Sequence, residues 1–463
     1  MELKRLDYDY GFYTGRKFKR LFNIFARICE LEGKEVLSQS QRHILTLKKY
    51  YPQRLERIRG LGFSLGINPD RLLALPTYLS KFIKVGCTNT VCAPPATKDG
   101  QIYLSWNMDI FSATRVMRYL PLLHISDLPN SHKYFCLGLP CLGGLGLLND
   151  QGLSYAPTAV GMKDGGGEGL LDFELNNLAM ESCENVEEVV SLYKDKPKYS
   201  FPGWSAGIFL NLNCIWGDSL GGGVAIEHSS HHLAFEYLKE GIMAIANHHQ
   251  FLNRDLTGSV NPEQMPAISG SYCRLGRMWN LLKSYQGEID LKVMKKITAD
   301  HKLEIEHLKG YSYQEPVDDA TICGHYWNLL DHLKRGRIKR AVEAYLMGRT
   351  ILSWIIEPKK LTIWLCRGNP CRSPFIPIYC AEMLGAPPPS FDSHKEKESR
   401  IINSALKINT KIDRSFWRIP GTKKALDALF QYFLKKLLLL SFFLLEKIIP
   451  ISHQEGRRVK PQQ

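Results

Sequence analysis

Apolar side chains in the N-terminal part of the chain recur at the three- and four-residue spacing of an amphipathic helix. The first such series comprises Phe18, Leu21, Phe22, Phe25 and Ile28. Further along, Gly66 predicts a helix end, and Asn68-Pro69-Asp70 provides an N-cap followed by proline at the first helical position. We therefore expect residues 15–75 to form a helical unit.

After Val85 the pattern changes to short apolar runs bounded by turn residues. Runs at 91–93 and 102–106 are separated by Pro94-Pro95 and Asp99-Gly100, which is typical of two strands joined by a turn. Similar runs occur at 207–216, 223–227, 232–237, 241–247, 351–356 and 361–366, and helical windows occur at 171–193 and 271–285. Because strands and helices are grouped, the pattern favours a layered α+β body over alternating βαβ units.

The composition shifts again beyond Cys371. Pro387-Pro388-Pro389 and a charged stretch at 392–400 predict a linker, so we expect the body to end at residue 386. A helical run at 422–449 has an apolar centre at 437–445, which is about 13 Å of helix against about 30 Å of hydrocarbon. That centre should not span a bilayer. Contact with a membrane surface and docking on protein remain equally open.

Composition and charge narrow the function only partly. A chain of 463 residues with 44% hydrophobic and 23% charged residues is typical of a soluble globular protein. The N-terminus lacks a signal-peptide h-region, so we expect a cytoplasmic protein with mostly free thiols among its 12 cysteines. A net charge of +14 permits binding to anionic partners. We expect no nucleic-acid partner, because no nucleic-acid-binding motif accompanies that charge.

The junction Gly86-Cys87 lies where the helical leader meets the first strand. A cysteine thiol can attack the preceding carbonyl only at close approach, which glycine permits because it lacks a Cβ. Hydrolysis would leave Cys87 with an α-amine whose pKa lies near 8, suitable as a base for its own thiol. On these two residues alone, the alternative of an ordinary structural Gly-Cys pair stays open.

Several short motifs follow one another in a fixed order between Gly11 and Tyr379. They lie at 57–60, 66–67, 86–88, 104–109, 149–153, 218, 225–227, 246–248, 362–365 and 368–371. In this order the chain resembles the acyl-coenzyme A:6-aminopenicillanic acid acyltransferase (isopenicillin-N acyltransferase) family of autoproteolytic N-terminal-nucleophile enzymes. The resemblance implies a four-layer αββα fold with a helical leader at 1–86, a catalytic domain at 87–386, and a linker and basic-apolar helical tail at 387–463.

The resemblance also implies roles for individual residues. Cys87 matches the family's nucleophile and new N-terminus, and Gly86 matches the residue on the leaving side. Asp109 would hold the α-amine, with turn capping as the alternative. Asn247 would stabilise the oxyanion through its side-chain N–H, with a local role at a strand end as the alternative.

Four further residues are candidates for substrate binding: Thr88, His248, Arg274 and Arg277. The two arginines resemble a stretch of bile-salt-hydrolase-like enzymes in which an arginine neighbours the nucleophile, although a solvated helix face explains at least one of them. Packing is the alternative for His248. The chain departs from the family pattern at Asn89, Thr158 and His249-Gln250, which puts the shape of the acyl pocket in doubt.

We expect no metal and no cofactor. The cluster Glu227, His228, His231 and His232 is interpreted as a surface turn between strands. Cys366 and Cys371 lack a second pair at matching spacing, so zinc is not expected. The glycine-rich stretches 143–146 and 165–167 lack the context of a phosphate-binding loop and are interpreted as loops near a site.

Taken with the resemblance, these residues predict an acyl-enzyme mechanism. The Cys87 thiolate would attack an amide or thioester carbonyl, and the acyl group would pass to water or to an amine. A linear amide is the first choice of substrate and acyl-coenzyme A the second, with the cleaved leader staying bound. The alternative is an inactive relative that serves as a binding or membrane-docking module, which would not need to cut itself.

Overall fold

The computed structural model describes residues 2–19, 22, 34–80, 86–110, 123–128, 130–202, 207–264, 268–317, 319–325, 328–341 and 349–385. They belong to a compact unit, Met1–Pro389, and a second unit comprises Ser390–Gln463. The expected linker and the tail at 422–449 lie outside the described residues. Within the described ranges, no helix combines the length and apolar character needed to cross a membrane.

The N-terminal part forms the expected helical unit. Its described helices are α1 (Glu2–Lys17), α3 (Lys34–Tyr50), α4 (Pro52–Leu65) and α5 (Pro69–Ser80). Gly66 ends α4 in the left-handed conformation with φ 68°, which glycine adopts without steric cost. The side chain of Asn68 accepts a hydrogen bond from Asp70 N (2.9 Å) at the start of α5. Both predicted helix boundaries are therefore confirmed.

The body contains two antiparallel sheets. The six-stranded sheet has the order β11 (Ile242–Ile245), β1 (Gly86–Cys92), β2 (Tyr103–Ile110), β12 (Arg349–Glu357), β13 (Thr362–Arg367) and β14 (Phe375–Tyr379). The larger sheet has the order β10 (Leu233–Tyr237), β9 (Gly223–His228), β8 (Phe209–Gly217), β6 (Ser154–Met162), β5 (Gly143–Asn149), β4 (Tyr134–Leu139) and β3 (Leu123–Ser126), and β7 (Phe201–Pro202) pairs with β8.

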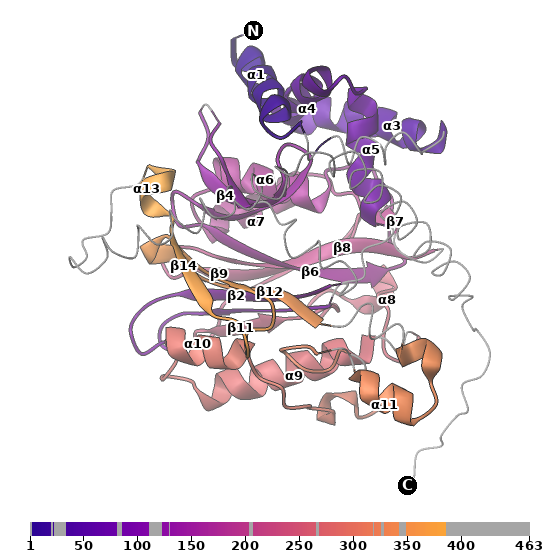
Figure 1. The fold of residues 1–463 in the computed structure, drawn as a ribbon, viewed down its shortest axis with the longest axis vertical. Coiled ribbons are helices and arrows are strands. Elements are labelled where there is room, and N and C mark those ends of the chain that lie inside the picture. Colours follow the sequence, from indigo (N-terminus) through magenta and orange to yellow (C-terminus); the bar gives the residue numbers. More distant parts are fainter. Residues whose placement is uncertain are drawn as a thin grey trace, which may run out of the picture. The chain divides into compact units, whose positions relative to one another are not determined.

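Helices cover the outer faces of both sheets (Figure 1). The larger sheet packs against α6 (Asp172–Ser182), α7 (Val186–Asp195) and the N-terminal helices. The six-stranded sheet packs against α9 (Ser269–Ser284) and α10 (Leu291–Thr298). A third apolar cluster, which includes Trp106 and Trp354 at a ring-centroid distance of 3.9 Å, fills the space between the sheets. The expected four-layer αββα architecture is confirmed.

Shorter elements connect these layers. They are α8 (Arg254–Thr257), α11 (Leu329–Lys334), α13 (Ala381–Leu384) and the 3-10 helices Glu306–Leu308 and Pro358–Lys360. Near the start of β12, Thr350 N donates a hydrogen bond to Gly324 O at 3.1 Å. This contact places the segment 319–325 beside the start of β12.

One glycine-rich stretch was wrongly interpreted as a loop. Gly143–Gly146 forms the first half of β5, within the larger sheet. A Cβ at Gly144 would overlap the Cys136 sulfur on β4, and a Cβ at Gly146 would overlap the side chain of Met180 on α6. Glycine is needed there because neighbouring elements approach the strand closely. By contrast, Gly166 and Gly167 have φ values of 80° and 88° and lie outside the strands.

Candidate active site

Cys87 is the second residue of β1 and lies between β2 and β11. Ile245, the last residue of β11, pairs with Asn89, so Asn247 follows the strand at the level of Cys87. The backbone N–H of Cys87 donates to Asn247 Oδ1 at 2.7 Å. Two residues that lie 160 positions apart along the chain are therefore joined directly at the Gly86–Cys87 peptide bond.

Arg274 on α9 connects this pair to its surroundings. Its Nε donates to Thr88 Oγ1 at 3.0 Å, and its Nη2 donates to Asn247 Oδ1 at 2.6 Å and lies 3.5 Å from Cys87 O. Its Nη1 donates to both the carboxylate and the backbone carbonyl of Asp319. The guanidinium is buried, and its planar fork can hold all these acceptors at once. The fold thus brings Cys87, Thr88, Asn247 and Arg274 together.

Asp109 lies opposite Gly86 in the β1–β2 register. Its Oδ1 accepts a hydrogen bond from Thr350 Oγ1 at 2.5 Å. Burial raises the pKa of Asp109 well above its usual range, the nearby Asp319 charge adds to the rise, and Arg274 opposes it. The expected partner of the Cys87 nitrogen was Asp109, whereas in the intact chain that nitrogen donates to Asn247.

The Asn247 amide is oriented differently from the expectation. Its Nδ2 donates to Ala159 O at 2.9 Å on β6, while its Oδ1 faces Cys87 N and Arg274. One of the two Nδ2 hydrogens is therefore engaged across the sheets, which leaves one for an oxyanion. The same side chain ties the two sheets together beside Cys87.

The segment 319–325 contributes a residue that the sequence reasoning missed. Asp319 pairs with Arg274, and a Cβ placed on Gly86 would overlap the Asp319 carboxylate. Glycine at position 86 therefore has a steric reason in this fold as well as a chemical one. Asp319 belongs to no motif in the sequence. Thr350, which bonds Asp109, was missed for the same reason.

The Cys87 thiol lies in the apolar layer between the sheets. Its side chain is 2% exposed and belongs to the cluster that contains Trp106 and Met108. Burial raises the pKa of Cys87 to about 12, the Trp106 indole and Arg274 act to lower it, and Asp109 acts to raise it. The intact chain therefore holds a neutral thiol at neutral pH.

Two of the expected substrate-binding residues point elsewhere. His248 Nδ1 lies 2.8 Å from Ser271 Oγ, and its ring stacks on Tyr272 at a centroid distance of 3.9 Å and an interplanar angle of 6°. Arg277 forms a two-point ion pair with Asp300, at 2.9 and 2.8 Å. In the intact chain, packing accounts for His248 and an ion pair for Arg277.

The Glu227 and His228 side chains are buried, so interpreting the whole cluster as a surface turn was wrong. Glu227 accepts hydrogen bonds of 2.8 to 2.9 Å from the backbone N–H groups of 250–252. His228 Nε2 lies 2.6 Å from Asp172 Oδ1. The turn itself comprises Ser229 to His232, where Ser229 N donates to His232 O. Glu227 thereby holds the loop that follows Asn247.

Because two histidines are buried, we expect the free energy of unfolding to fall as the pH is lowered. Burial lowers the pKa of both His248 and His249 from 6.5 to about 3. Below pH 6.5 the unfolded chain binds protons that the folded chain does not, so stability should fall between pH 6.5 and 3 by up to about 1.4 kcal/mol per pH unit for each histidine. Urea unfolding at several pH values should show a slope smaller by about one proton in His248→Phe, which keeps the stacking ring. An unchanged slope would contradict this assignment.

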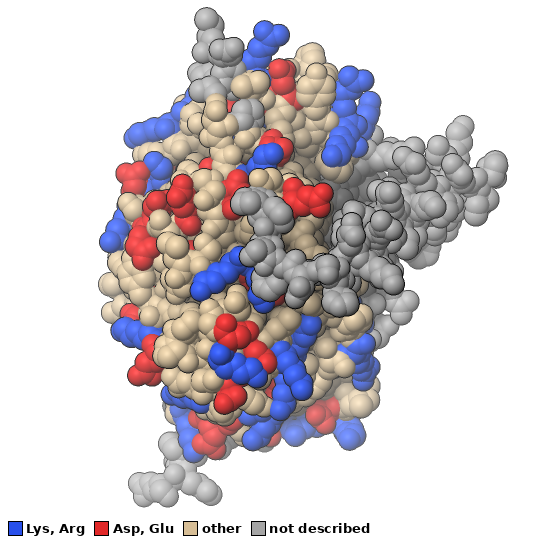
Figure 2. Space-filling model, turned by 90° about the vertical axis from the view of Figure 1, so that its left-hand side faces the viewer, with Lys and Arg blue, Asp and Glu red and all other residues tan. Residues whose placement is uncertain are grey.

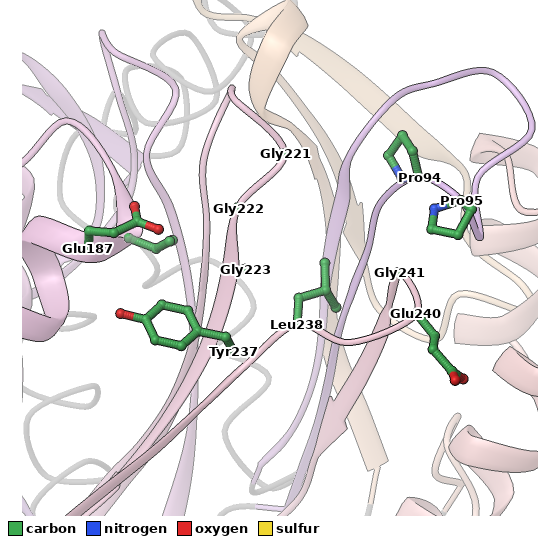
Figure 3. Close-up of a pocket in the computed structure, with 11 residues that line it drawn as sticks. Pro94, Pro95, Glu187, Gly221, Gly222, Gly223, Tyr237, Leu238, Glu240 and Gly241 are labelled. Carbon is green, nitrogen blue, oxygen red and sulfur yellow. The ribbon is translucent and has the colours of Figure 1, made fainter.

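A cavity of about 240 Å³ lies far from Cys87. In Figure 3, Tyr237 and Glu187 lie on one side and the Pro94-Pro95 turn on the other, with Gly221 to Gly223 between them. That turn follows the C-terminal end of β1, whereas Cys87 lies near its start. The cavity is therefore separated from Cys87 by most of the strand.

Charges of both signs are mixed on the face in Figure 2. Lysine and arginine side chains alternate there with aspartate and glutamate, without one large basic patch. The net charge of +14 therefore gives no single anion-binding surface on this face.

Neither a protein-family model nor a curated protein sequence matches the chain. Among solved structures, a variant of conjugated bile acid hydrolase from Clostridium perfringens is similar, with 14% identity, a TM-score of 0.35, and coverage of 61% of this chain and 89% of that one. Penicillin V acylase from Agrobacterium tumefaciens is similar with 12% identity, a TM-score of 0.27, and coverage of 61% and 83%. At these values, the likeness does not determine what this chain binds or cleaves.

Proposed function

We propose that this chain is an autoproteolytic cysteine amidohydrolase or acyltransferase of the N-terminal-nucleophile type, with Cys87 as nucleophile. The contact between Cys87 N and Asn247 Oδ1 (2.7 Å) carries the proposal, because it holds the amide that would be cut. Arg274 supports it by bridging Thr88 and Asn247 beside the same bond. The resemblance of its motifs to those of the acyltransferase family adds to this support.

Self-cleavage would begin with the thiol of Cys87. The sulfur attacks the carbonyl carbon of Gly86, the C–N bond breaks, and the nitrogen of Cys87 takes the thiol proton to become an amine. Water then hydrolyses the Gly86 thioester, which leaves a Gly86 carboxylate and restores the thiol. Arg274, at 3.5 Å from Cys87 O and paired with Asp319, holds the strand on one side of this bond.

Turnover would use the same sulfur. The α-amine of Cys87 accepts the thiol proton, and the thiolate attacks the substrate carbonyl. The resulting α-ammonium gives that proton to the substrate nitrogen, the C–N bond breaks, and the substrate's amine leaves behind an acyl-cysteine. Water or a second amine then takes the acyl group. Asn247 would orient the α-amine through Oδ1 in this scheme, and the free hydrogen on Nδ2 would face the oxyanion.

The leader would stay attached after the cut. Arg54 and His43 both contact Glu174 on α6 at 2.9 Å, and Arg57 contacts Glu181 on the same helix at 2.6 Å. The two arginines and the two glutamates are almost fully buried, His43 is partly exposed, and none of these contacts involves the peptide bond at Gly86. The two pieces would therefore copurify as one particle.

Intact mass under denaturing conditions tests the proposal. The wild type and Cys92→Ala, which replaces another buried cysteine of β1, should separate into pieces 1–86 and 87–463. Cys87→Ala should remain whole. If the wild type remains a single chain, the catalytic proposal fails and the binding-module alternative takes its place. If Cys87→Ala is also cut at this bond, an external protease is responsible.

The substrate class follows from the same chemistry. A linear amide is the first choice, and an acyl-coenzyme A thioester is the second. Cleaved protein should be offered matched acyl amides and acyl thioesters, with acyl-cysteine trapped at Cys87 and detected by mass.

Peripheral membrane contact through 422–449 is a separate part of the proposal, and loss of liposome sedimentation on deletion of 422–463 would support it.

A further inference from the structure

Four side chains that commonly bind metals converge at a place distinct from the Cys87 thiol. They are His301, Cys323, His325 and Cys371, and their potential ligand atoms all lie within 4.8 Å of one another. His325 Nε2 lies 3.6 Å from Cys323 Sγ and 3.2 Å from Cys371 Sγ. The rings of His301 and His325 have a centroid distance of 4.9 Å.

Backbone contacts hold the three segments that carry these side chains. Cys323 N donates to Asp300 O at 3.0 Å, which places Cys323 beside the residue before His301. His325 pairs with Arg349 at the start of β12. Asn369 Nδ2 donates to Gly324 O at 2.6 Å, which brings the loop of Cys371 against the same turn. The fold therefore assembles the cluster independently of any bond between its sulfurs.

From this arrangement we infer that His301, Cys323, His325 and Cys371 form a tetrahedral binding site for a zinc-class divalent cation. Zinc–sulfur bonds are about 2.3 Å and zinc–nitrogen bonds about 2.0 Å, so tetrahedral ligand atoms lie about 3.3–3.8 Å apart. The two measured sulfur–nitrogen distances, 3.6 and 3.2 Å, agree with that spacing to within a few tenths of an ångström. Two cysteines with two histidines are also a common ligand set for structural zinc.

The surroundings suit a charged site with an entry path. Cys323 is buried, whereas His301 and Cys371 lie at the surface, from which an ion can enter. Asn369 Nδ2 lies 3.9 Å from Cys323 Sγ and can donate to a bound thiolate. On binding, the two thiols would release two protons, and the two thiolates would neutralise the charge of the ion.

This inference differs from the expectation that the chain has no zinc site. That expectation paired Cys371 with Cys366, its nearest cysteine along the chain. Cys366 Sγ instead donates to Ser373 O at 3.4 Å. The partners of Cys371 are His301 and two residues of the segment 319–325, all far away in sequence, so no short spacing motif exists to reveal them.

The proposed ion would stabilise a segment that contacts the candidate active site. Gly324, which lies between Cys323 and His325, donates through its N–H to Thr350 Oγ1 at 2.8 Å. Thr350 in turn donates to Asp109 at 2.5 Å. Asp319 lies at the start of the same segment. An ion that fixes 323–325 would therefore fix the hydrogen-bond partner of Asp109, which is a structural role.

Cobalt binding to the reduced full-length protein tests the site. Co²⁺ added to metal-stripped protein should give the visible bands of tetrahedral cobalt and a thiolate charge-transfer band, saturating at one ion per chain, and Zn²⁺ should displace it. Cys371→Ser should weaken cobalt binding by at least about 100-fold. Cys141→Ser, which removes a half-buried cysteine that packs against the leader side of the larger sheet and is not in the cluster, should bind cobalt as the wild type does.

Three results would overturn the inference. The first is absence of a thiolate charge-transfer band in the reduced wild type, and the second is equal cobalt affinity in Cys371→Ser and the wild type. The third is a disulfide between Cys323 and Cys371, seen as a mass lower by two hydrogens, in protein that binds no cobalt after reduction. These readouts need no cleavage at Cys87 and no substrate, so they are independent of the proposed function.

Discussion

Replacing Arg274 by lysine should slow conversion of the intact chain into its two pieces by about 100-fold, the loss expected when a reacting group is misplaced by about 1 Å. Arg274 contacts Thr88, Asn247 and Asp319 through different nitrogens of one rigid plane. Lysine keeps the positive charge but has a single nitrogen and cannot hold three partners in that geometry. The fraction of intact chain, followed by mass during expression and after purification, gives the rate.

Arg277→Lys provides the matched control. It lies one helical turn further along α9 and pairs with Asp300 instead of the cluster at Cys87. The Arg277→Lys variant should therefore cleave itself at the wild-type rate. Circular dichroism and urea unfolding of both variants should show a folded protein. Equal cleavage rates in the two variants would mean that Arg274 only packs α9 against the sheet.

Arg57→Met should lower the free energy of unfolding by about 3–5 kcal/mol, because it leaves buried carboxylates without their cation. Arg57 donates to Glu181 from two nitrogens, at 2.6 and 3.0 Å, and to Asp7 at 2.7 Å. Tyr51 also donates to Glu181 at 2.6 Å. Among the described residues, this group is one of two buried ion-pair contacts between α4 and α6, beside Arg54–Glu174, so its loss should also weaken retention of a cleaved leader during gel filtration.

The neighbouring Arg59 offers the control for Arg57. Its ion pair with Glu56 is partly exposed to solvent, so Arg59→Met should cost less than about 1 kcal/mol. Adding Glu181→Gln to Arg57→Met should recover part of the lost stability, since the unpaired buried charge is removed. No recovery in the double variant would show that the packing of Arg57, rather than its charge, determines the loss.

Periodicity and turn residues predicted most of the elements that form the six-stranded sheet and the leader. Gly66 and Pro69 specify helix ends through local backbone chemistry, which a sequence shows directly. The strands between 123 and 162 were missed, in part because Gly144 and Gly146 are selected by close neighbours instead of by strand propensity. This requirement for glycine arises from the packing of neighbouring elements, and a single amino-acid sequence does not reveal it.

The candidate site was predictable only where motifs carried it. Cys87 and Asn247 belong to the segments that suggested the family, and Arg274 belongs to a stretch that resembles bile-salt-hydrolase-like enzymes. The fold brings all three within hydrogen-bond distance. Asp319 and Thr350 complete the same network from segments without a motif. The Cys323 and Cys371 side chains meet because the segment 319–325 contacts the start of β12 and the connection between β13 and β14, which no local spacing encodes.

The close contact between Asp319 and Gly86 would favour self-cleavage over religation. Cutting the chain at this point creates a carboxylate on Gly86, against the acidic side chain of Asp319. Like charges in a buried setting repel strongly, so the new chain end should leave the strand instead of religating. Cleavage would thus move Gly86, the last residue of the leader, out of the strand and make the amine of Cys87 accessible to substrate. In this molecule, irreversibility would be an electrostatic property of the product.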